Sequence, residues 1–148
     1  MAIKIHHANS YGNGSMLTVV PVVGDGFIFT INPQNSKGAA FASFDHEKPA
    51  SFLVTFAEVG ELLGVFRGMQ ESVRDGKGLY CRGEFYASVM KLRHEIEPRH
   101  GYRLSVAVKA VGGTQDEPKS FEIFLDTYEA TSLMLAIEGS MGRVFLGD

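Results

Sequence analysis

Hydrophobic residues recur at helical spacing in two stretches of the chain, residues 55–68 and 126–139. Within each stretch they occupy positions i, i+3, i+4 and i+7, which lie on one face of a helix. Each stretch begins with a helix-capping residue, Thr55 or Asp126, and a glutamate follows three positions later, as in a capping box. Each stretch ends on a glycine, the residue that most readily closes a helix in a left-handed conformation. The pattern predicts one amphipathic helix in each half of the chain.

The two helix signals are separated by a constant number of residues. Thr55 and Asp126 are 71 positions apart, and the glutamates, the apolar positions and the final glycines keep the same spacing. A tandem duplication explains this agreement better than a coincidence between two common amphipathic patterns. We therefore expect a single domain, residues 1–148, made of two pseudo-repeats of about 11–70 and about 79–148.

Alternating hydrophobic and polar residues precede each helix signal and predict antiparallel strands. One short helix cannot cover a four-stranded sheet, so the two halves have a physical reason to pack together. The expected fold class is α+β, with tandem duplicated ββββα units that form two antiparallel sheets packed with two helices. The strands are expected within residues 16–34, which form a hairpin around Asp25-Gly26, and within 38–45, 51–56, 79–97, 102–111 and 120–125, and residues 141–148 read as a short apolar tail.

Two consecutive strands of the second half show the clearest alternation of apolar and charged residues. Matching their apolar sides as an antiparallel pair places Leu92 opposite Val108. This register leaves residues 99–101 as a three-residue loop whose glycine takes a left-handed conformation. It also places Lys91 opposite Lys109, and two opposed lysines repel each other unless an anion lies over them.

Charge is distributed unevenly along the chain. The chain carries 14 Lys and Arg residues against 17 Asp and Glu residues, which gives a net charge of −3. Residues 74–109 hold eight of the basic and four of the acidic residues, so this segment carries +4 and the rest carries −7. A concentrated basic segment is compatible with a polyanionic partner, although on this feature alone an ordinary solvated face is the more common explanation.

The cysteine content and the length of the apolar runs indicate the cellular compartment in which the protein is expected. Cys81 is the only cysteine, so no internal disulfide can form and a reducing, cytoplasmic setting is expected. No apolar run approaches the roughly 20 residues that cross a bilayer, and the first residues lack the apolar region of a signal peptide. We expect no membrane association.

The motifs, in their order along the chain, resemble those of the Whirly family of single-stranded DNA-binding proteins, which are related in fold to the transcriptional coactivator positive cofactor four. Residues 11–21 resemble the first-strand motif Y-K-G-K-A-A-L-S-V-x-P, although glycines replace its two lysines, and residues 25–33 resemble D-G-F-L-L-L-Q-F-A-P. Residues 52–63 resemble F-S-L-S-V-T-E-I-G-T-L-I, and residues 102–109 resemble F-x-L-S-V-Q-N-K. Each piece is short, so the shared order is the stronger signal.

The resemblance implies a partner and an assembly. It implies binding of single-stranded DNA with little sequence specificity, in replication, recombination, repair or transcription. It also implies a homo-oligomer, a tetramer, with nucleic acid along the sheet edges between subunits. RNA stays open as a partner, because stacking and phosphate contacts do not read the 2′-hydroxyl. The chain has no organelle-targeting extension of the plant type, so a bacterial or phage-encoded protein is expected.

Sequence-tolerant binding of a single strand needs flat side chains for the bases and cations for the phosphates. Phe29 and Phe44 are the expected stacking residues, because their neighbours are polar and they lie near Lys37 and Lys48. A phenylalanine in an alternating strand is, however, more often part of a core. The full set of candidate nucleic-acid-binding residues is Phe29, Lys37, Phe44, Lys48, Arg82, Lys91, Arg93, Arg103 and Lys109.

Catalytic and metal-binding motifs are absent from the sequence. It contains no H-E-x-x-H, C-x-x-C or G-x-x-x-x-G-K-[ST], and His46, His94 and His100 show no metal-ligand spacing. His94 falls on an apolar face, which is typical of a core histidine. We expect no enzyme activity, no cofactor and no bound metal. The alternative function is a protein-interaction or structural module, such as a small phage or assembly component, that does not bind nucleic acid.

Overall fold

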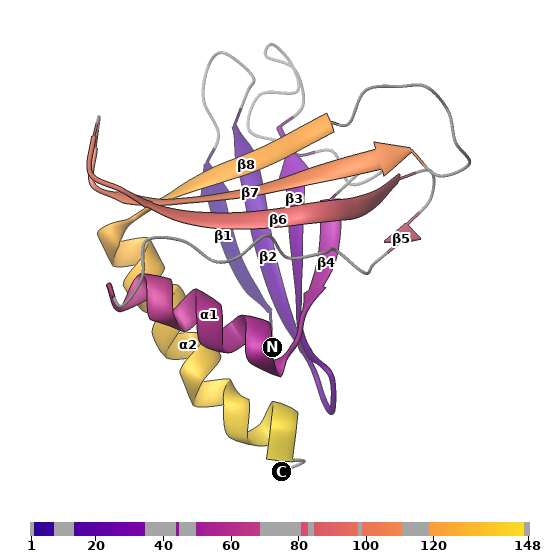
Figure 1. Ribbon diagram of the computed structural model, residues 1–148, viewed down its shortest axis with the longest axis vertical. Helices are drawn as coiled ribbons and strands as arrows, with labels where there is room; N and C mark the ends of the chain where they lie inside the picture. The colour runs from indigo at the N-terminus through magenta and orange to yellow at the C-terminus, as the bar shows by residue number, and fades with distance from the viewer. Residues whose placement is uncertain are drawn as a thin grey trace.

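Two four-stranded antiparallel sheets, each followed by one helix, make up the fold (Figure 1). The computed structural model describes residues 2–7, 14–34, 44, 50–68, 81–82, 85–97, 99–110 and 119–146, and for residues 50, 81–82, 85–90, 107–110 and 119–120 it describes the backbone alone. The first unit comprises β1 (Ile3–His7), β2 (Ser15–Val22), β3 (Gly26–Pro33), β4 (Ala50–Val54) and α1 (Phe56–Phe66). The second comprises β5 (Cys81–Arg82), β6 (Phe85–Glu95), β7 (Gly101–Ala110), β8 (Lys119–Asp126) and α2 (Thr127–Leu146).

This architecture confirms the predicted α+β class with two successive ββββα units. The strands pair in chain order in both sheets, so no strand crosses over another within a sheet. The first unit includes β1, which lies before residue 11, where the first pseudo-repeat was expected to begin. Of the strand expected at residues 38–45, the structure describes Phe44, which forms an isolated bridge with Gln34. The remainder of that segment lies outside the described residues, and the duplication itself stays a prediction.

Equivalent rows of apolar side chains line the inner faces of the two sheets. The strands of the second sheet run across those of the first, and both helices pack on the same side of this crossing (Figure 1). One core cluster draws side chains from both sheets and both helices. Removing each such side chain from water contributes about 1.5–3 kcal/mol. The two central rows, all 2% exposed or less, are Val19, Phe29 and Phe52 in the first sheet and Leu92, Leu104 and Ile123 in the second.

The tight turn between β2 and β3 confirms the hairpin predicted at Asp25-Gly26. The Asp25 N–H donates to the Val22 carbonyl at 3.0 Å, and Val22 pairs with Gly26. Gly26 has a φ of 150°, and a Cβ at this position would lie 2.1 Å from the Val54 carbonyl oxygen. The turn therefore requires glycine both for its backbone conformation and for its approach to β4.

Helix α1 begins and ends where the sequence pattern places it. Glu58 Oε1 accepts hydrogen bonds from the Thr55 backbone N–H at 3.3 Å and from the Thr55 hydroxyl at 2.8 Å. Gly68 follows the helix with a φ of 74°, and its N–H donates to the Val65 carbonyl at 3.0 Å. The predicted glycine terminator is thus confirmed for α1.

Helix α2 begins as predicted but continues past Gly139, so the predicted stop is wrong. Asp126 and Glu129 form the expected reciprocal capping box, with hydrogen bonds of 2.8 and 3.1 Å. The helix then runs to Leu146, because Ser140 and Val144 continue its buried face, at 3% and 1% exposure. The last turn is also held by tertiary structure, since the Gly24 N–H donates to the Val144 carbonyl at 2.6 Å. Residues 141–146 are therefore a packed extension of the helix and not a separate tail.

Several polar contacts join the two units. The Ser15 hydroxyl donates to the Glu122 carbonyl at 2.7 Å, which links β2 to β8. His7 Nε2 lies 2.7 Å from Glu129 Oε2, which links β1 to the first turn of α2. Arg67 and Glu138 form an ion pair between the C-terminal end of α1 and the middle of α2. Across the described ranges, neither helix is long and apolar enough to span a membrane.

Candidate functional site

The β6–β7 hairpin determines which charged residues face each other, and its register differs from the predicted one. Leu92 pairs with Leu104 instead of Val108, and Lys91 pairs with Ser105 instead of Lys109. Strand β6 ends at Glu95 and β7 begins at Gly101, so the predicted three-residue loop at 99–101 is wrong. Shifting a register by an even number of residues keeps every side chain on its original face, so matching apolar faces cannot separate the two solutions. The predicted repulsion between two opposed lysines is therefore wrong.

A contact between β7 and β8 accounts for the observed register. Gly101 was expected in the loop in a left-handed conformation, but it is the first residue of β7 and pairs with Glu95 and Asp126. A Cβ on Gly101 would lie 2.4 Å from the Phe124 ring and 2.5 Å from the Leu125 carbonyl oxygen. Phe124 thus occupies the space that only a glycine leaves open.

The outer face of the second sheet carries three parallel rows of side chains, and we call this surface the outer face throughout. Charged residues predominate in these three rows, and Phe124 is the aromatic residue among them. The register gives the rows as Lys91, Ser105 and Glu122; Arg93, Arg103 and Phe124; and Glu95, Gly101 and Asp126.

Arg103 lies at the centre of the outer face and is paired with carboxylates on both sides. Its guanidinium contacts Glu95 at 3.0 and 3.3 Å and Glu122 at 2.9 Å. Hydrogen bonding to Glu95, together with the attraction of Glu122, raises the pKa of Arg103 against the opposing effect of burial. Arg103 lies directly opposite Arg93, and the two carboxylates offset the repulsion between these like charges. Arg103 therefore organises its neighbours and offers little uncompensated charge.

Two arginine side chains cover Phe124. The Arg99 guanidinium carbon lies 3.9 Å from the centre of the Phe124 ring, and that of Arg103 lies 5.5 Å from it. These contacts leave the phenylalanine 7% exposed although it projects away from the core. Arg99, by contrast, is exposed. A planar guanidinium stacked on an aromatic ring presents a flat, positively charged surface to solvent.

Neither Arg99 nor Phe124 was among the predicted binding residues, although the strand pattern carried a signal for Phe124. In β8 the inward residues are Phe121, Ile123 and Leu125, so alternation places Phe124 with the polar side chains. A phenylalanine on the polar side of a strand is the informative exception to the pattern. Arg99 lies in the hairpin loop, where no periodicity applies, so only the folded structure places it over the ring.

Arg93 and Lys91 complete the cationic side of the outer face. Both side chains are exposed and lie along β6, two positions apart. Within the part of the chain that the structure describes, Arg93 has no hydrogen-bond or ion-pair partner. Arg93 is separated from Phe124 by the β7 strand, or about 10 Å at the usual strand spacing. Cations and a stacked ring thus lie within the span of adjacent nucleotides.

Phe29 does not belong to any exposed surface, so its predicted stacking role is wrong. It lies on the inner face of β3, is 1% exposed, and stacks on Phe52 with ring centres 5.5 Å apart. Its polar neighbour Thr30 points to the opposite face and bonds Ser51 at 2.9 Å. Strand alternation decides burial here, and the polarity of adjacent residues does not.

Phe44 lies on the opposite side of the molecule from the outer face. It is partly buried, and its ring is 5.6 Å from that of His6 in a tilted arrangement. His6 and Lys4 are exposed on the outward side of β1. The first and second sheets share a core, so Phe44 cannot join Lys91, Arg93 and Arg103 in one groove within a protomer.

Four predicted residues cannot be placed as side chains. Lys37 and Lys48 lie outside the described residues. Arg82 in β5 pairs with Phe85, and Lys109 in β7 pairs with Tyr86, and for both the backbone alone is described. Their binding roles stay predictions.

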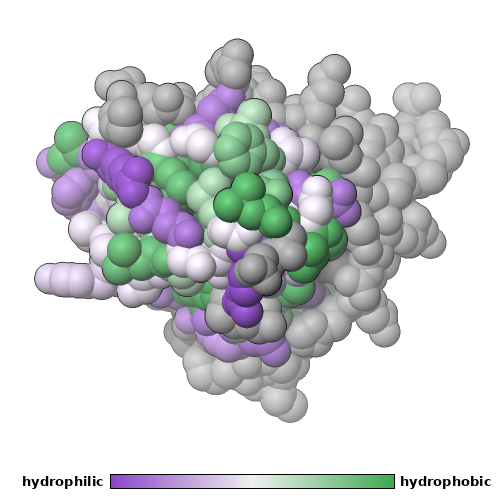
Figure 2. Space-filling model, turned by 90° about the horizontal axis from the view of Figure 1, so that it is seen from below, coloured by the Kyte–Doolittle hydropathy of each residue, from purple (hydrophilic) through white to green (hydrophobic). Residues whose placement is uncertain are grey.

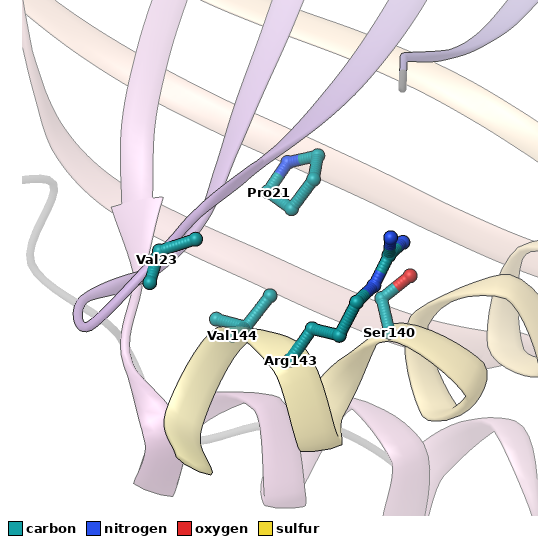
Figure 3. A pocket seen from close by; sticks show the side chains of 5 residues that line it. All are labelled: Pro21, Val23, Ser140, Arg143 and Val144. Carbon is teal, nitrogen blue, oxygen red and sulfur yellow. The ribbon is translucent and has the colours of Figure 1, made fainter. Parts of the chain in front are cut away.

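A separate cavity of about 220 Å³ lies between the end of β2 and the last turns of α2. Figure 3 shows the Arg143 side chain extending beside Ser140 toward Pro21, with Val23 and Val144 at the opposite end. None of the predicted binding residues lines this cavity. It is open and mostly apolar, and it does not adjoin the outer face.

Comparison with known proteins finds matches among solved structures and none among family models or curated protein sequences. No protein-family model matches the chain, and no curated protein matches it. The crystal structure of WHY1 from Arabidopsis thaliana matches with a TM-score of 0.66 at 17% identity, over 97% of this chain and 92% of that chain. The plant transcriptional regulator PBF-2 matches with a TM-score of 0.64 at 17% identity, over 98% of this chain and 84% of that chain.

A third solved structure extends the comparison to RNA. A guide-RNA-binding protein complex bound to a guide RNA matches with a TM-score of 0.67 at 14% identity, over 96% of this chain and 90% of that chain. At these identities the similarity is one of fold. The chain has a Whirly-like fold, which confirms the resemblance that its motifs indicate.

Proposed function

We propose that this chain is a non-catalytic protein that binds single-stranded nucleic acid, with single-stranded DNA as its principal partner and with little sequence specificity. One observation carries the proposal: Arg99 stacks on Phe124 at 3.9 Å beside the exposed Arg93 and Lys91. The fold shared with a complex bound to a guide RNA supports it. The proposed setting is a cytoplasmic process of replication, recombination, repair or transcription.

The outer face offers both kinds of contact that an unpaired strand needs. A base stacks on the guanidinium of Arg99, or on Phe124 itself once Arg99 swings aside to a phosphate. Each stacked base contributes about 1–3 kcal/mol. Arg93 and Lys91 then follow the backbone, and each phosphate contact steepens the salt dependence of binding.

Low specificity follows from the chemistry of these groups. Every base has a π face, so a ring and a guanidinium accept all four. The cations of the outer face recognise phosphate and not base edges. The same groups accept RNA, so the two nucleic acids are compared in one assay.

The proposed homo-oligomer, a tetramer by resemblance, would use the helical side of the molecule. Viewed from that side, Figure 2 shows apolar side chains gathered between polar ones. Such exposed apolar side chains are common where subunits meet. They include Val23 at 70% exposure, Phe56 at 63%, Leu135 at 58% and Leu146 at 84%. Association there would leave the outer face of each subunit accessible to nucleic acid.

The test is a gel-shift titration with a labelled oligo-dT at low and at moderate salt. The wild-type chain is expected to bind, with an affinity that falls as salt rises. The double variant Arg93→Glu, Arg99→Glu is expected to lose binding at low salt. Its matched control is Lys4→Glu, Arg143→Glu, which makes the same change in net charge at two exposed cations away from the outer face.

The two variants separate a local site from a general charge effect. Equal loss in both would show that net charge governs binding, and undiminished binding by the first would remove the outer face as the site. No binding by the wild-type chain at micromolar protein would favour the alternative function. That alternative, a protein-interaction or structural module, draws on the exposed apolar residues of the helical side.

A further inference from the structure

Two histidines converge on the side of the β6–β7 hairpin that faces away from the outer face. His94 Nε2 lies 2.8 Å from His100 Nε2, and the ring centres are 5.0 Å apart. The sequence spacing of these residues indicates no metal site, because one belongs to a strand and the other to the loop that follows it. The hairpin loop brings the same nitrogen of both rings to one point.

The first of these histidines is held in position by a buried tyrosine. The His94 ring stacks on Tyr102 at 4.9 Å with an interplanar angle of 24°. Tyr102 is 7% exposed, packs against Phe66 at 5.1 Å, and donates its hydroxyl hydrogen to the Phe66 carbonyl at 3.1 Å. Burial also raises the pKa of Tyr102, so the hydroxyl stays a donor. His94 is thus a preorganised ligand, and the exposed His100 can adjust to it.

The present nitrogen spacing, that of a hydrogen bond, is close to the ligand spacing of one metal geometry. Two cis ligands at about 2.0 Å from a tetragonal ion lie about 2.8 Å apart, whereas two ligands of a tetrahedral zinc ion lie about 3.3 Å apart. The two rings, now 2.8 Å apart, would need to separate less for a tetragonal ion than for a tetrahedral one. Among divalent ions with that preference, copper binds imidazole more tightly than nickel.

We propose that His94 and His100 form a two-histidine site for a divalent transition-metal ion of tetragonal preference, with copper(II) bound most tightly. Nε2 of both rings supplies a lone pair, so the ring that donates in the present hydrogen bond carries its proton on Nδ1 when the metal binds. In the described ranges no third His, Cys, Asp or Glu side chain joins this pair, so water fills the remaining positions. The His94 ring and the outer face lie on opposite faces of the hairpin, so the metal site and the nucleic-acid site use different side chains.

The test titrates copper(II) alone, in a weakly coordinating buffer, into the full chain and follows it by calorimetry and by electron paramagnetic resonance. The wild-type chain is expected to bind one ion with two nitrogen ligands at this site. Loss of an outer-shell partner weakens metal sites about 10–100-fold, so His94→Gln and His100→Gln should each weaken binding at least that much. His6→Gln, at an exposed histidine on the first sheet, is the matched control and should bind as the wild type does.

Tyrosine fluorescence gives a second measurement. The chain has no tryptophan, so its emission comes from tyrosine, and Tyr102 lies directly on His94. Copper(II) should quench this emission in the wild type and not in His100→Gln. Tyr102→Phe should retain copper binding while losing most of the quenching.

Several outcomes would overturn the proposal. Binding by His100→Gln with wild-type affinity would do so, as would equal loss in His6→Gln. Preference for zinc over copper would exclude the geometry. Since His100 is exposed in the loop, its variant is expected to fold, and it decides the question if His94→Gln does not.

Discussion

The inner faces of the two sheets are alike, and their outer faces differ. In the first sheet one outward row contains Lys4, Thr18 and Thr30, and a hydrogen bond joins the hydroxyl groups of Thr30 and Ser51. In the second sheet the corresponding surface carries the exposed cations and the arginine-covered Phe124. Two units with one topology therefore present different chemistry to solvent.

The difference shows which residues of a strand are constrained by the core and which can serve a function. Burial constrains alternate residues, so both central rows are apolar and nearly inaccessible. The residues between them lie outside the shared core and are free to differ. The arrangement of the core specifies the fold, and the proposed function resides in the outward residues of one sheet.

The largest expected effect is a loss of stability, and it tests whether the central apolar rows of the two sheets are equivalent. Phe52→Ala should lower the free energy of unfolding by about 3–5 kcal/mol and Ile123→Ala by about 2–5 kcal/mol, because each leaves a cavity in the shared core. Urea denaturation followed by circular dichroism measures both. If either variant lost less than about 1 kcal/mol, the two rows would not be equivalent parts of one core.

The next prediction concerns the close contact between Gly101 and Phe124 in the second sheet, which has no counterpart among the described residues of the first sheet. Gly101→Ala should destabilise the chain by about 1–3 kcal/mol, because its methyl group meets the Phe124 ring and the Leu125 carbonyl. The control is Gly60→Ala in α1, where nothing lies within 4 Å of the added carbon, and it should stabilise by about 0.4–1 kcal/mol. Thermal unfolding of the two variants gives the comparison. Equal stability of Gly101→Ala and the wild type would mean that Phe124 does not rest on Gly101.

Sequence periodicity predicted the elements well because burial imposes it. The two capping boxes, the Asp25-Gly26 turn and the strands on either side of them were all accessible to local patterns. Local patterns failed where tertiary contacts decide the outcome. Helix α2 continues past Gly139 because Val144 is buried and its carbonyl is bonded by the β2–β3 turn.

The candidate site was only partly predictable, for the same reason. Lys91, Arg93 and Arg103 were predicted from the alternation of a basic segment, and they do share the outer face. Apolar matching could not fix the register, and it could not place a loop arginine over an aromatic ring. Phe29 was misread because the alternation of its own strand was given less weight than its polar neighbours.

A third prediction sets the aromatic residues of the two sheets against each other. Phe124→Ala should weaken binding to oligo-dT by about 1–3 kcal/mol, the contribution of one stacked base. Phe44→Ala should have a smaller effect, because its ring is partly buried against His6 and away from the paired cations. Fluorescence anisotropy at fixed salt measures both affinities. The reverse order would move the binding site to the first sheet.

The smallest expected effect concerns the contact between the two helices. Arg67 and Glu138 are 71 positions apart, the same spacing that separates the helix signals in the sequence. Equivalent residues of two like units meet each other only near a local two-fold axis, so this ion pair marks where such an axis would pass.

The side chains of Arg67 and Glu138 are partly exposed. A double-mutant cycle of Arg67→Ala and Glu138→Ala should therefore give a coupling energy of about 0.2–1 kcal/mol that shrinks in high salt. The control is a double-mutant cycle of Arg67→Ala and Arg143→Ala. Arg143 has no ion-pair partner in the described ranges, so this cycle should show no coupling. A coupling of zero in the first cycle would leave the helices packed by apolar contacts alone, and the charge pair would then carry no information about how the two units are related.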